Sequence, residues 1–227
     1  NDMPAIRQSM GSAGTQTATL SMGGASSTPP AYKATSYEFD GTNWSGGGDL
    51  STARANISGC GLQTAGLANG GFNGTSLTTT EKYNGSSWTS GGDLNTARSY
   101  STSFGIQTLA ICVGNAGQPP GAVVESYNGT SWSETTENNS GRYGSGGAGI
   151  ATSGIIFGGN PYTGITESWN GSAWTEVADL ATGRVYVAGA GGSNTSALAV
   201  GGLSSAPTSV TATEEWTISE VTIKTVT

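Results

Sequence analysis

The charged residues best suited to chemistry recur at fixed spacing along the chain. Five arginines stand 47, 44, 44 and 42 residues apart: Arg7, Arg54, Arg98, Arg142 and Arg184. In four of five copies a glutamate lies two residues before an aromatic residue: Glu81, Glu125, Glu167 and Glu214. Such charges could line a channel, or could form one salt bridge per repeat that satisfies buried charge. Because a ligand site seldom occurs in every repeat, we predict structural ion pairs.

The composition removes most catalytic chemistry. The chain has no histidine, which excludes Ser-His-Asp and Cys-His catalysis and removes the commonest transition-metal ligand. Cys60 and Cys112 cannot form a zinc site alone, and we interpret them as buried thiols, with a disulfide as the alternative. No two carboxylates stand out as an acid and nucleophile pair. We therefore predict a protein that is not an enzyme, with no catalytic residue, metal site or cofactor.

The charge balance limits the partners as well. Eight Lys and Arg face fifteen Asp and Glu, a net charge of −7, whereas nucleic-acid binding needs clustered basic residues. No apolar run approaches the roughly 20 residues of a membrane span. We expect neither nucleic acid as a partner nor insertion into a membrane.

The elements that must position these charges follow from the repeat. A glycine lies seven residues after each arginine, a Gly-Gly pair follows in four copies, and Asp/Asn-Gly turns precede a tryptophan in the first four. Asn-Gly between β-type segments is the strongest short-range hairpin signal, and four strands per unit of 42–47 residues are typical of a propeller blade. We predict an all-β, five-bladed β-propeller with four antiparallel strands per blade. It forms a single domain, 1–227, with blades at 2–48, 49–92, 93–136, 137–178 and 179–227.

The order Arg, apolar strand, Gly-Gly, Glu-x-Tyr, Asn-Gly-x-x-Trp resembles the kelch repeat over essentially the whole chain. The stretch from Tyr83 to Arg98 is similar to Thr- and Gly-rich kelch-like arrays of bacteriophage virion and tail proteins, marine phages above all, and of some bacterial surface proteins. This resemblance implies a propeller displayed on a virion or an extracellular surface. The fold hosts enzymes and adaptors alike, so the resemblance guides function weakly.

The segments that do not repeat are the loops between the second and third strands of each blade. Strand alternation places them on the face that also carries the segment leading into each blade, and variable loops on a rigid scaffold are where binding usually occurs. An idle surface is the equal alternative. The candidate ligand-binding residues in these loops are Tyr32, Lys33, Phe72, Asn73, Gln118, Asn160 and Tyr162.

From these observations we expect a non-enzymatic, surface-displayed binding or structural module. The first expectation is a phage tail, fibre or capsid-decoration protein that contacts host glycans or other virion proteins. The alternative is a subunit of a bacterial extracellular filament or surface layer, and a glycan-cleaving enzyme is third. Self-association into a homo-oligomer is left open. Because the chain starts and stops at blade boundaries, we expect blades one and five to pack together without exchanging a strand.

Overall fold

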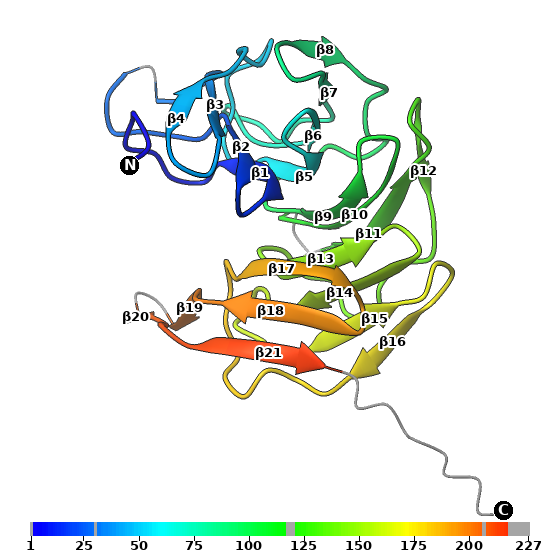
Figure 1. Cartoon of the computed structure of the whole chain (residues 1–227). Helices are drawn as coiled ribbons and strands as arrows, with labels where there is room; N and C mark the ends of the chain where they lie inside the picture. Colours follow the sequence, from blue (N-terminus) through cyan, green and yellow to red (C-terminus); the bar gives the residue numbers. More distant parts are fainter. Residues whose placement is uncertain (1, 30, 117–120, 206–207, 218–227) are drawn as a thin grey trace, which may run out of the picture.

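The computed structural model describes residues 2–29, 31–116, 121–205 and 208–217, and every regular element in these ranges is a β-strand. The strands form small antiparallel sheets that follow one another around a central axis as the blades of a five-bladed β-propeller (Figure 1). This confirms the predicted fold class. Within those ranges no helix is long and apolar enough to cross a membrane.

The first two blades each contain four strands paired in chain order. Blade 1 comprises β1 (Gly11–Thr15), β2 (Ala18–Met22), β3 (Ser36–Phe39) and β4 (Trp44–Gly46). Blade 2 comprises β5 (Ser58–Leu62), β6 (Ala65–Asn69), β7 (Thr80–Tyr83) and β8 (Trp88–Ser90).

The remaining blades repeat this order. Blade 3 comprises β9 (Thr102–Ile106), β10 (Leu109–Asn115), β11 (Gly121–Tyr127) and β12 (Trp132–Glu134). Blade 4 comprises β13 (Gly146–Ile150), β14 (Ser153–Phe157), β15 (Thr166–Trp169) and β16 (Trp174–Val177). Blade 5 has β17 (Ala188–Ser193), β18 (Ser196–Val200) and β21 (Thr213–Thr217), with the short ribbon β19 (Leu203–Ser205) and β20 (Thr208–Ser209). Its predicted fourth strand, 221–226, lies outside the described residues.

The hairpin between the third and fourth strands forms as the Asn-Gly signal predicts. In blade 2, Oδ1 of Asn84 accepts hydrogen bonds from the backbone N–H groups of Ser86 and Ser87, at 3.0 and 2.9 Å. Gly85 has φ +93°, a conformation that a residue with a Cβ rarely adopts. The side chain thus supplies the turn, and the glycine lets the chain reverse.

In blades 1, 2 and 4 the Gly-Gly pair joins the blade to the next one. The N–H of Gly71 donates to the carbonyl of Arg98 in blade 3 at 2.9 Å, and that of Gly24 donates to Arg54 in blade 2 at 2.9 Å. A Cβ on Gly70 would lie 2.6 Å from the Arg98 carbonyl oxygen. Glycine is required because the two backbones touch at this point.

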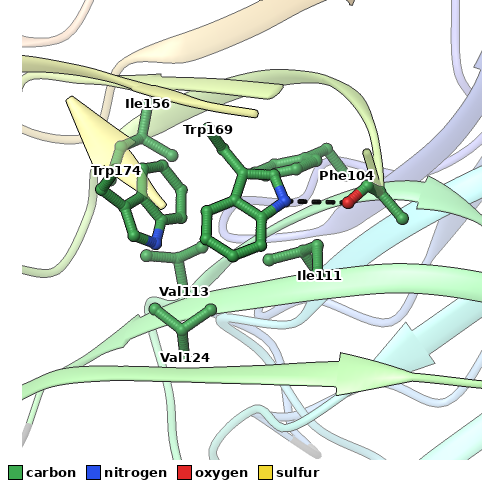
Figure 2. Packing of buried hydrophobic residues seen from close by; sticks show 8 residues of the cluster. Phe104, Ile111, Val113, Val124, Ile156, Trp169 and Trp174 are labelled. Carbon is green, nitrogen blue, oxygen red and sulfur yellow. Dashed lines mark hydrogen bonds between the residues drawn. The ribbon is translucent and has the colours of Figure 1, made fainter. Parts of the chain in front are cut away.

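The hydrophobic core lies between blades. Figure 2 shows the interface of blades 3 and 4, where Ile111 and Val113 of β10 face Ile156 and the two indoles Trp169 and Trp174. The indole centroids lie 5.1 Å apart, and the Trp169 indole N–H donates to the carbonyl of Ala151 at 2.8 Å. Burial of large aromatic rings supplies most of the energy of such an interface, about 1.5–3 kcal/mol per fully buried large apolar side chain. The repeated tryptophans therefore belong to the scaffold.

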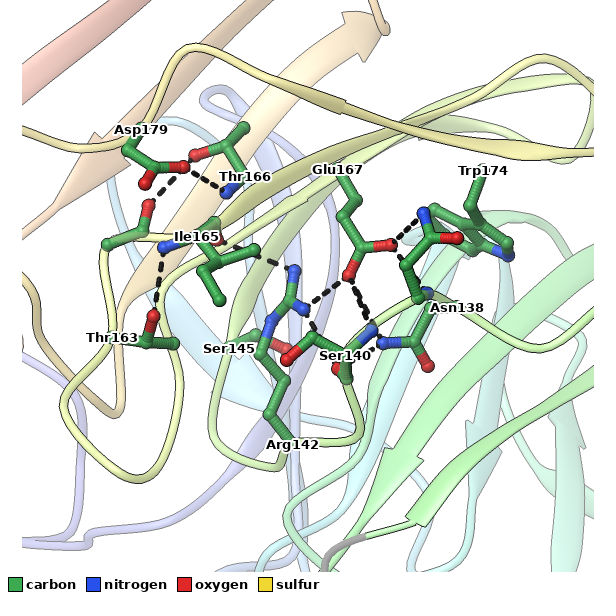
Figure 3. A network of polar contacts seen from close by, with 12 residues as sticks. Asn138, Ser140, Arg142, Ser145, Thr163, Ile165, Thr166, Glu167, Trp174 and Asp179 are labelled. Carbon is green, nitrogen blue, oxygen red and sulfur yellow. Dashed lines mark hydrogen bonds and ion pairs between the residues drawn. The ribbon is translucent and has the colours of Figure 1, made fainter.

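The repeated ion pairs lie inside the blades, as predicted. Arg142 and Glu167, both almost wholly buried, form a salt bridge in blade 4 (Figure 3). Glu167 also accepts hydrogen bonds from the backbone N–H groups of Asn139 and Ser140, at 2.7 and 3.3 Å. Equivalent pairs occur in three other blades: Arg54–Glu81, Arg98–Glu125 and Arg184–Glu214.

Blade 1 lacks the glutamate, and its arginine is held by other partners. The guanidinium of Arg7 donates to the carbonyls of Gly23 and Thr35, at 3.0 and 2.9 Å. It also lies 5.0 Å from the ring centroid of Tyr37, which occupies the glutamate position. A cation–π contact and two carbonyl acceptors thus replace the ion pair.

One prediction about the ring is wrong. Blades 1 and 5 do not pack closely among the described residues, contrary to the expectation. No described strand of blade 5 pairs with blade 1, and because the predicted C-terminal strand, 221–226, lies outside the described residues, the absence of strand exchange stays a prediction. The innermost strands adjoin one another in the series β1, β5, β9, β13 and β17 (Figure 1). Every residue of β17 except Ser193 is exposed. Blade 1 carries the partly exposed Thr19 where blade 2 has Gly66, so it offers blade 5 a more polar surface.

Candidate functional site

The loops between second and third strands share one face of the propeller with the segments that lead into each blade. In blade 2 the backbones of Ala55 and Phe72 exchange hydrogen bonds of 2.9 and 2.8 Å. In blade 5, Val185 and Leu203 exchange two of 2.9 Å. We call this side of the molecule the loop face, and its position agrees with the prediction from strand alternation.

The structure brings some of the predicted loop residues together and separates others. The rings of Tyr32 and Phe72, from neighbouring blades, meet edge to face with centroids 6.1 Å apart. Lys33 is used locally, since its ammonium donates to the carbonyl of Thr28 at 3.0 Å. The backbone N–H of Asn73 donates to Thr75 at 3.3 Å within a tight turn.

The other three loop candidates lie in blades 3 and 4. The backbone N–H of Asn160 donates to the carbonyl of Tyr143 at 2.9 Å, which anchors the blade 4 loop to the leading segment. Tyr162, next in this loop, is half-buried, with a left-handed φ of +54°. Gln118 lies outside the described residues.

A second feature of the loop face surrounds the propeller axis. The residue two positions after each arginine has a left-handed backbone, with φ between 53° and 64°: Ser9, Asn56, Tyr100, Gly144 and Tyr186. Each N–H of this series after the first donates to the carbonyl of the preceding member, over distances of 2.6 to 3.3 Å. These residues form a backbone chain that links all five blades at the mouth of the axial channel.

Two members of this series are tyrosines, and a bulky residue in this conformation is a genuine outlier. Such strain persists only where the surroundings enforce it, and it is concentrated at ligand-binding and active sites. Here the interblade hydrogen bonds of the mouth enforce the conformation of Tyr100 and Tyr186. Glycine occurs in blade 4 for a steric reason, because a Cβ on Gly144 would lie 2.9 Å from the ring of Tyr186.

Tyrosine rings gather at the mouth. The ring centroid of Tyr100 lies 5.4 Å from that of Tyr186 and 6.0 Å from that of Tyr143. Burial raises the pKa of Tyr186, and the neighbouring phenols of Tyr100, Tyr143 and Tyr162 add to this rise. We call Tyr100, Tyr143 and Tyr186 the mouth tyrosines.

Two of the mouth tyrosines, Tyr100 and Tyr186, border a cavity of about 540 Å³ on the propeller axis, and Tyr143 packs beside Tyr100. Its lining combines aromatic rings with small neutral polar groups, among them Ser9, Asn56 and Ser101. Further along the axis a second cavity, of about 460 Å³, is lined mainly by the small residues of the innermost strands. Neither lining contains a carboxylate or a basic side chain in the described part of the chain. The mouth can therefore offer stacking and neutral hydrogen bonds to a ligand.

The prediction from sequence missed the mouth tyrosines. Arginine is common to all five leading segments, whereas the residue two positions later changes type in almost every copy. That change of residue at a fixed position of the repeat is the signal that could have pointed to them. Attention to loop length and proline content led to the outer loops instead.

The other reactive side chains are buried in the scaffold. Cys60 and Cys112 are free thiols in the interior, and burial raises the pKa of Cys60 to about 12. Across residues 2–29, 31–116, 121–205 and 208–217, no group of three or more Cys, Asp or Glu side chains is placed to hold a metal ion.

No known protein-family model matches the chain. None of the curated proteins matches it either.

Proposed function

We propose that this protein is a non-enzymatic binding module that takes a neutral glycan at the mouth of its axial channel. The observation that carries the proposal is the pair of rings, Tyr100 and Tyr186, at the edge of an uncharged cavity on the axis, with the ring of Tyr143 packed beside that of Tyr100. Aromatic faces stack on the C–H faces of sugar rings, and a phenol supplies both an apolar body and a hydrogen-bonding tip. Pockets with an apolar wall and a few placed polar groups are the usual form of a ligand site.

The chemistry of the lining supports a carbohydrate over other ligand classes. Ser9, Asn56 and Ser101 provide hydroxyl and amide groups that can donate to or accept from sugar hydroxyls. A phosphorylated or anionic ligand would call for basic residues at the cavity. Among the residues that the structure describes, no carboxylate pair lines the cavity, and the sequence has no histidine; both observations support binding without hydrolysis.

We further propose that the module belongs to a virion, as a tail, fibre or capsid-decoration component that contacts host surface glycans or other virion proteins. Support for this comes from the kelch-like, Thr- and Gly-rich repeat and from the net charge of −7. A rigid propeller with its ligand site at one end of the axis suits attachment to a larger particle through another face.

The experiment is a glycan array with the wild-type protein and a double variant, Tyr100→Asn with Tyr186→Asn. Asparagine is the matched choice because Asn56 occupies the same position of the repeat and tolerates a left-handed backbone. We expect the wild type to retain a defined set of neutral glycans and the variant to lose them while its circular dichroism is unchanged. A wild type that binds no glycan would overturn the proposal.

A second candidate function is a self-assembling subunit of an extracellular filament or surface layer. The observation that favours it is the exposed apolar face of blade 5.

A further inference from the structure

One face of blade 5 carries the apolar residues that are buried between blades elsewhere in the propeller, but in blade 5 these residues are exposed. Leu198 of β18 is 40% exposed, whereas its counterparts in blades 1 to 4 are at most 2% exposed: Leu20, Leu67, Ile111 and Ile155. Ala190 of β17 is exposed too, and its counterpart in blade 4, Ala148, is buried. In the first four blades these side chains pack against the following blade. Blade 5 therefore presents a packing surface that lacks its neighbour.

Blade 1 presents the complementary half of the same kind of interface. Gln63 of blade 2 donates through Nε2 to the carbonyls of Thr19 and Phe39 in blade 1, at 3.2 and 2.7 Å. Gln107 of blade 3 makes the equivalent pair of bonds to blade 2, at 2.9 and 2.6 Å. Gln16 is their counterpart in blade 1, and it is exposed without a hydrogen bond in the described part of the chain.

The repeated tryptophans also bond to the preceding blade in blades 2 and 3 but not in blade 1. The indole N–H groups of Trp88 and Trp132 donate at 3.0 Å to hydroxyls of the preceding blade, those of Ser36 and Thr80. Trp44, their counterpart in blade 1, is partly exposed, and its indole N–H has no acceptor among residues 2–29, 31–116, 121–205 and 208–217. By position in the repeat, the acceptor for Trp44 would be Thr213 of a blade 5.

The two halves do not meet within one chain. The series of backbone hydrogen bonds at the mouth runs from Ser9 to Tyr186 and does not return to Ser9 among the described residues. In Figure 1, β1 and β17 lie at the two ends of the row of innermost strands. A second copy of the chain offers both complementary faces without any change in the arrangement of the five blades.

We propose that blade 5 of one molecule packs against blade 1 of a second copy, in a head-to-tail contact that continues the interblade interface. Leu198 covers Thr19 of the partner, as Leu20 covers Gly66 within the chain, where a Cβ at Gly66 would lie 2.7 Å from Leu20 Cδ2. Gln16 donates to carbonyls of β18 and β21, and Trp44 donates to Thr213. Because the contact joins two different surfaces, it propagates into a ring or a filament.

The composition of the receiving face fits a surface that is exposed to water before assembly. Blade 1 carries the partly exposed Thr19 where blade 2 has Gly66, whereas Ser21, at the position of Ala68, is buried and donates to Met10 Sδ at 3.3 Å. Interfaces between separately folded molecules are more polar than domain cores. A blade 1 face with the partly exposed Thr19 and Trp44 suits a partner that arrives from solution.

Disulfide trapping between two variants that each carry one introduced cysteine tests the proposal. Thr19→Cys and Leu198→Cys proteins, each with the buried Cys60 and Cys112 retained, are mixed and oxidised, and a mixed disulfide dimer is expected. The matched control replaces Leu198→Cys by Leu109→Cys, which changes a leucine of similar exposure (44%) outside this interface. The control mixture should give no dimer.

The double variant, Thr19→Cys with Leu198→Cys, shows whether blade 5 packs against blade 1 of a second copy or against blade 1 of the same chain. Disulfide-linked oligomers support a second copy. A disulfide within one chain, with no oligomer, shows that the ring closes on itself and overturns the proposal, and so does the absence of any mixed disulfide.

In light scattering, Leu198→Asp should weaken self-association by about tenfold or more because a carboxylate would be buried unpaired, while circular dichroism should be unchanged. Equal association of Leu198→Asp and wild type would also overturn the proposal. None of these readouts depends on glycan binding.

Discussion

Replacing Glu167 by glutamine removes one negative charge from the interior of blade 4 and keeps the side-chain size. Glu167 forms an ion pair with the guanidinium of Arg142. Its carboxylate also accepts hydrogen bonds from the backbone N–H of Asn139 at 2.7 Å and from the side-chain amide of Asn139 at 2.8 Å. Both members of the ion pair are almost wholly buried. After the substitution, Arg142 keeps neutral acceptors alone, the glutamine amide oxygen and the backbone carbonyls of Ser140 at 2.9 Å and Ile165 at 3.4 Å. A positive charge then stays inside the blade without a counterion.

The expected cost follows from that arrangement. Removing one partner of a buried ion pair destabilises a protein by about 3–5 kcal/mol. In a chain of this size about 1 kcal/mol lowers Tm by roughly 2–4 °C, so we expect a fall of roughly 6–20 °C. The assay is thermal and urea unfolding followed by tryptophan fluorescence.

The matched control is Glu176→Gln, on the adjacent strand. Glu176 is the cross-strand neighbour of Glu167 but is exposed, so its substitution should change the free energy of unfolding by no more than about 0.5 kcal/mol. If Glu167→Gln cost less than about 1 kcal/mol, or if the two variants were equal, the assignment of the repeated ion pairs to the scaffold would be refuted.

Three further predictions concern the scaffold. Burial alone would raise the pKa of Glu167, but Arg142 and the N–H donors lower it overall, so its contribution to stability is present above about pH 4.5 and is lost as pH falls through the folded-state pKa; the difference in Tm between wild type and Glu167→Gln should shrink in acid, and a constant difference would contradict this. Gly70→Ala should destabilise by at least about 1 kcal/mol, because φ is +61° and the new Cβ meets a carbonyl oxygen, whereas Gly192→Ala, with open space around it, should be close to neutral in the same melts. Cys60 should react with a thiol reagent at pH 8 only as the protein unfolds, because burial raises its pKa to about 12, and fast labelling of the native protein would oppose this.

The scaffold could be predicted from sequence because it depends on residue types that recur. The Arg142–Glu167 pair and the Asn84-Gly85 turn each require a particular side chain, so the repeat made them visible. Replacement of the glutamate by Tyr37 was visible too, and the structure explains it through the contact with Arg7.

The mouth could not be predicted in the same way. What its members share is a left-handed backbone and a hydrogen bond to the preceding blade, which residues as different as Ser9, Asn56 and Tyr186 all adopt. The change of residue type marks this position as variable, but it does not report the left-handed backbone, which the neighbouring blades enforce. Whether blade 5 packs against blade 1 could not be predicted from the sequence either. Blade 5 carries Leu198 and blade 1 carries Gln16 at the interface positions of the repeat, and these residues are the same whether or not the two blades are in contact.

The most direct test of where binding occurs is calorimetric titration of one glycan with three proteins. These are the wild type, the double variant Tyr100→Asn with Tyr186→Asn, and Tyr32→Ala, which removes an aromatic ring from an outer loop of the same face. If the ligand stacks on the mouth tyrosines, the double variant should lose about tenfold or more in affinity, equivalent to at least about 1.4 kcal/mol, while Tyr32→Ala stays within about twofold of wild type. Full affinity in the double variant together with loss in Tyr32→Ala would place binding in the outer loops and contradict the account.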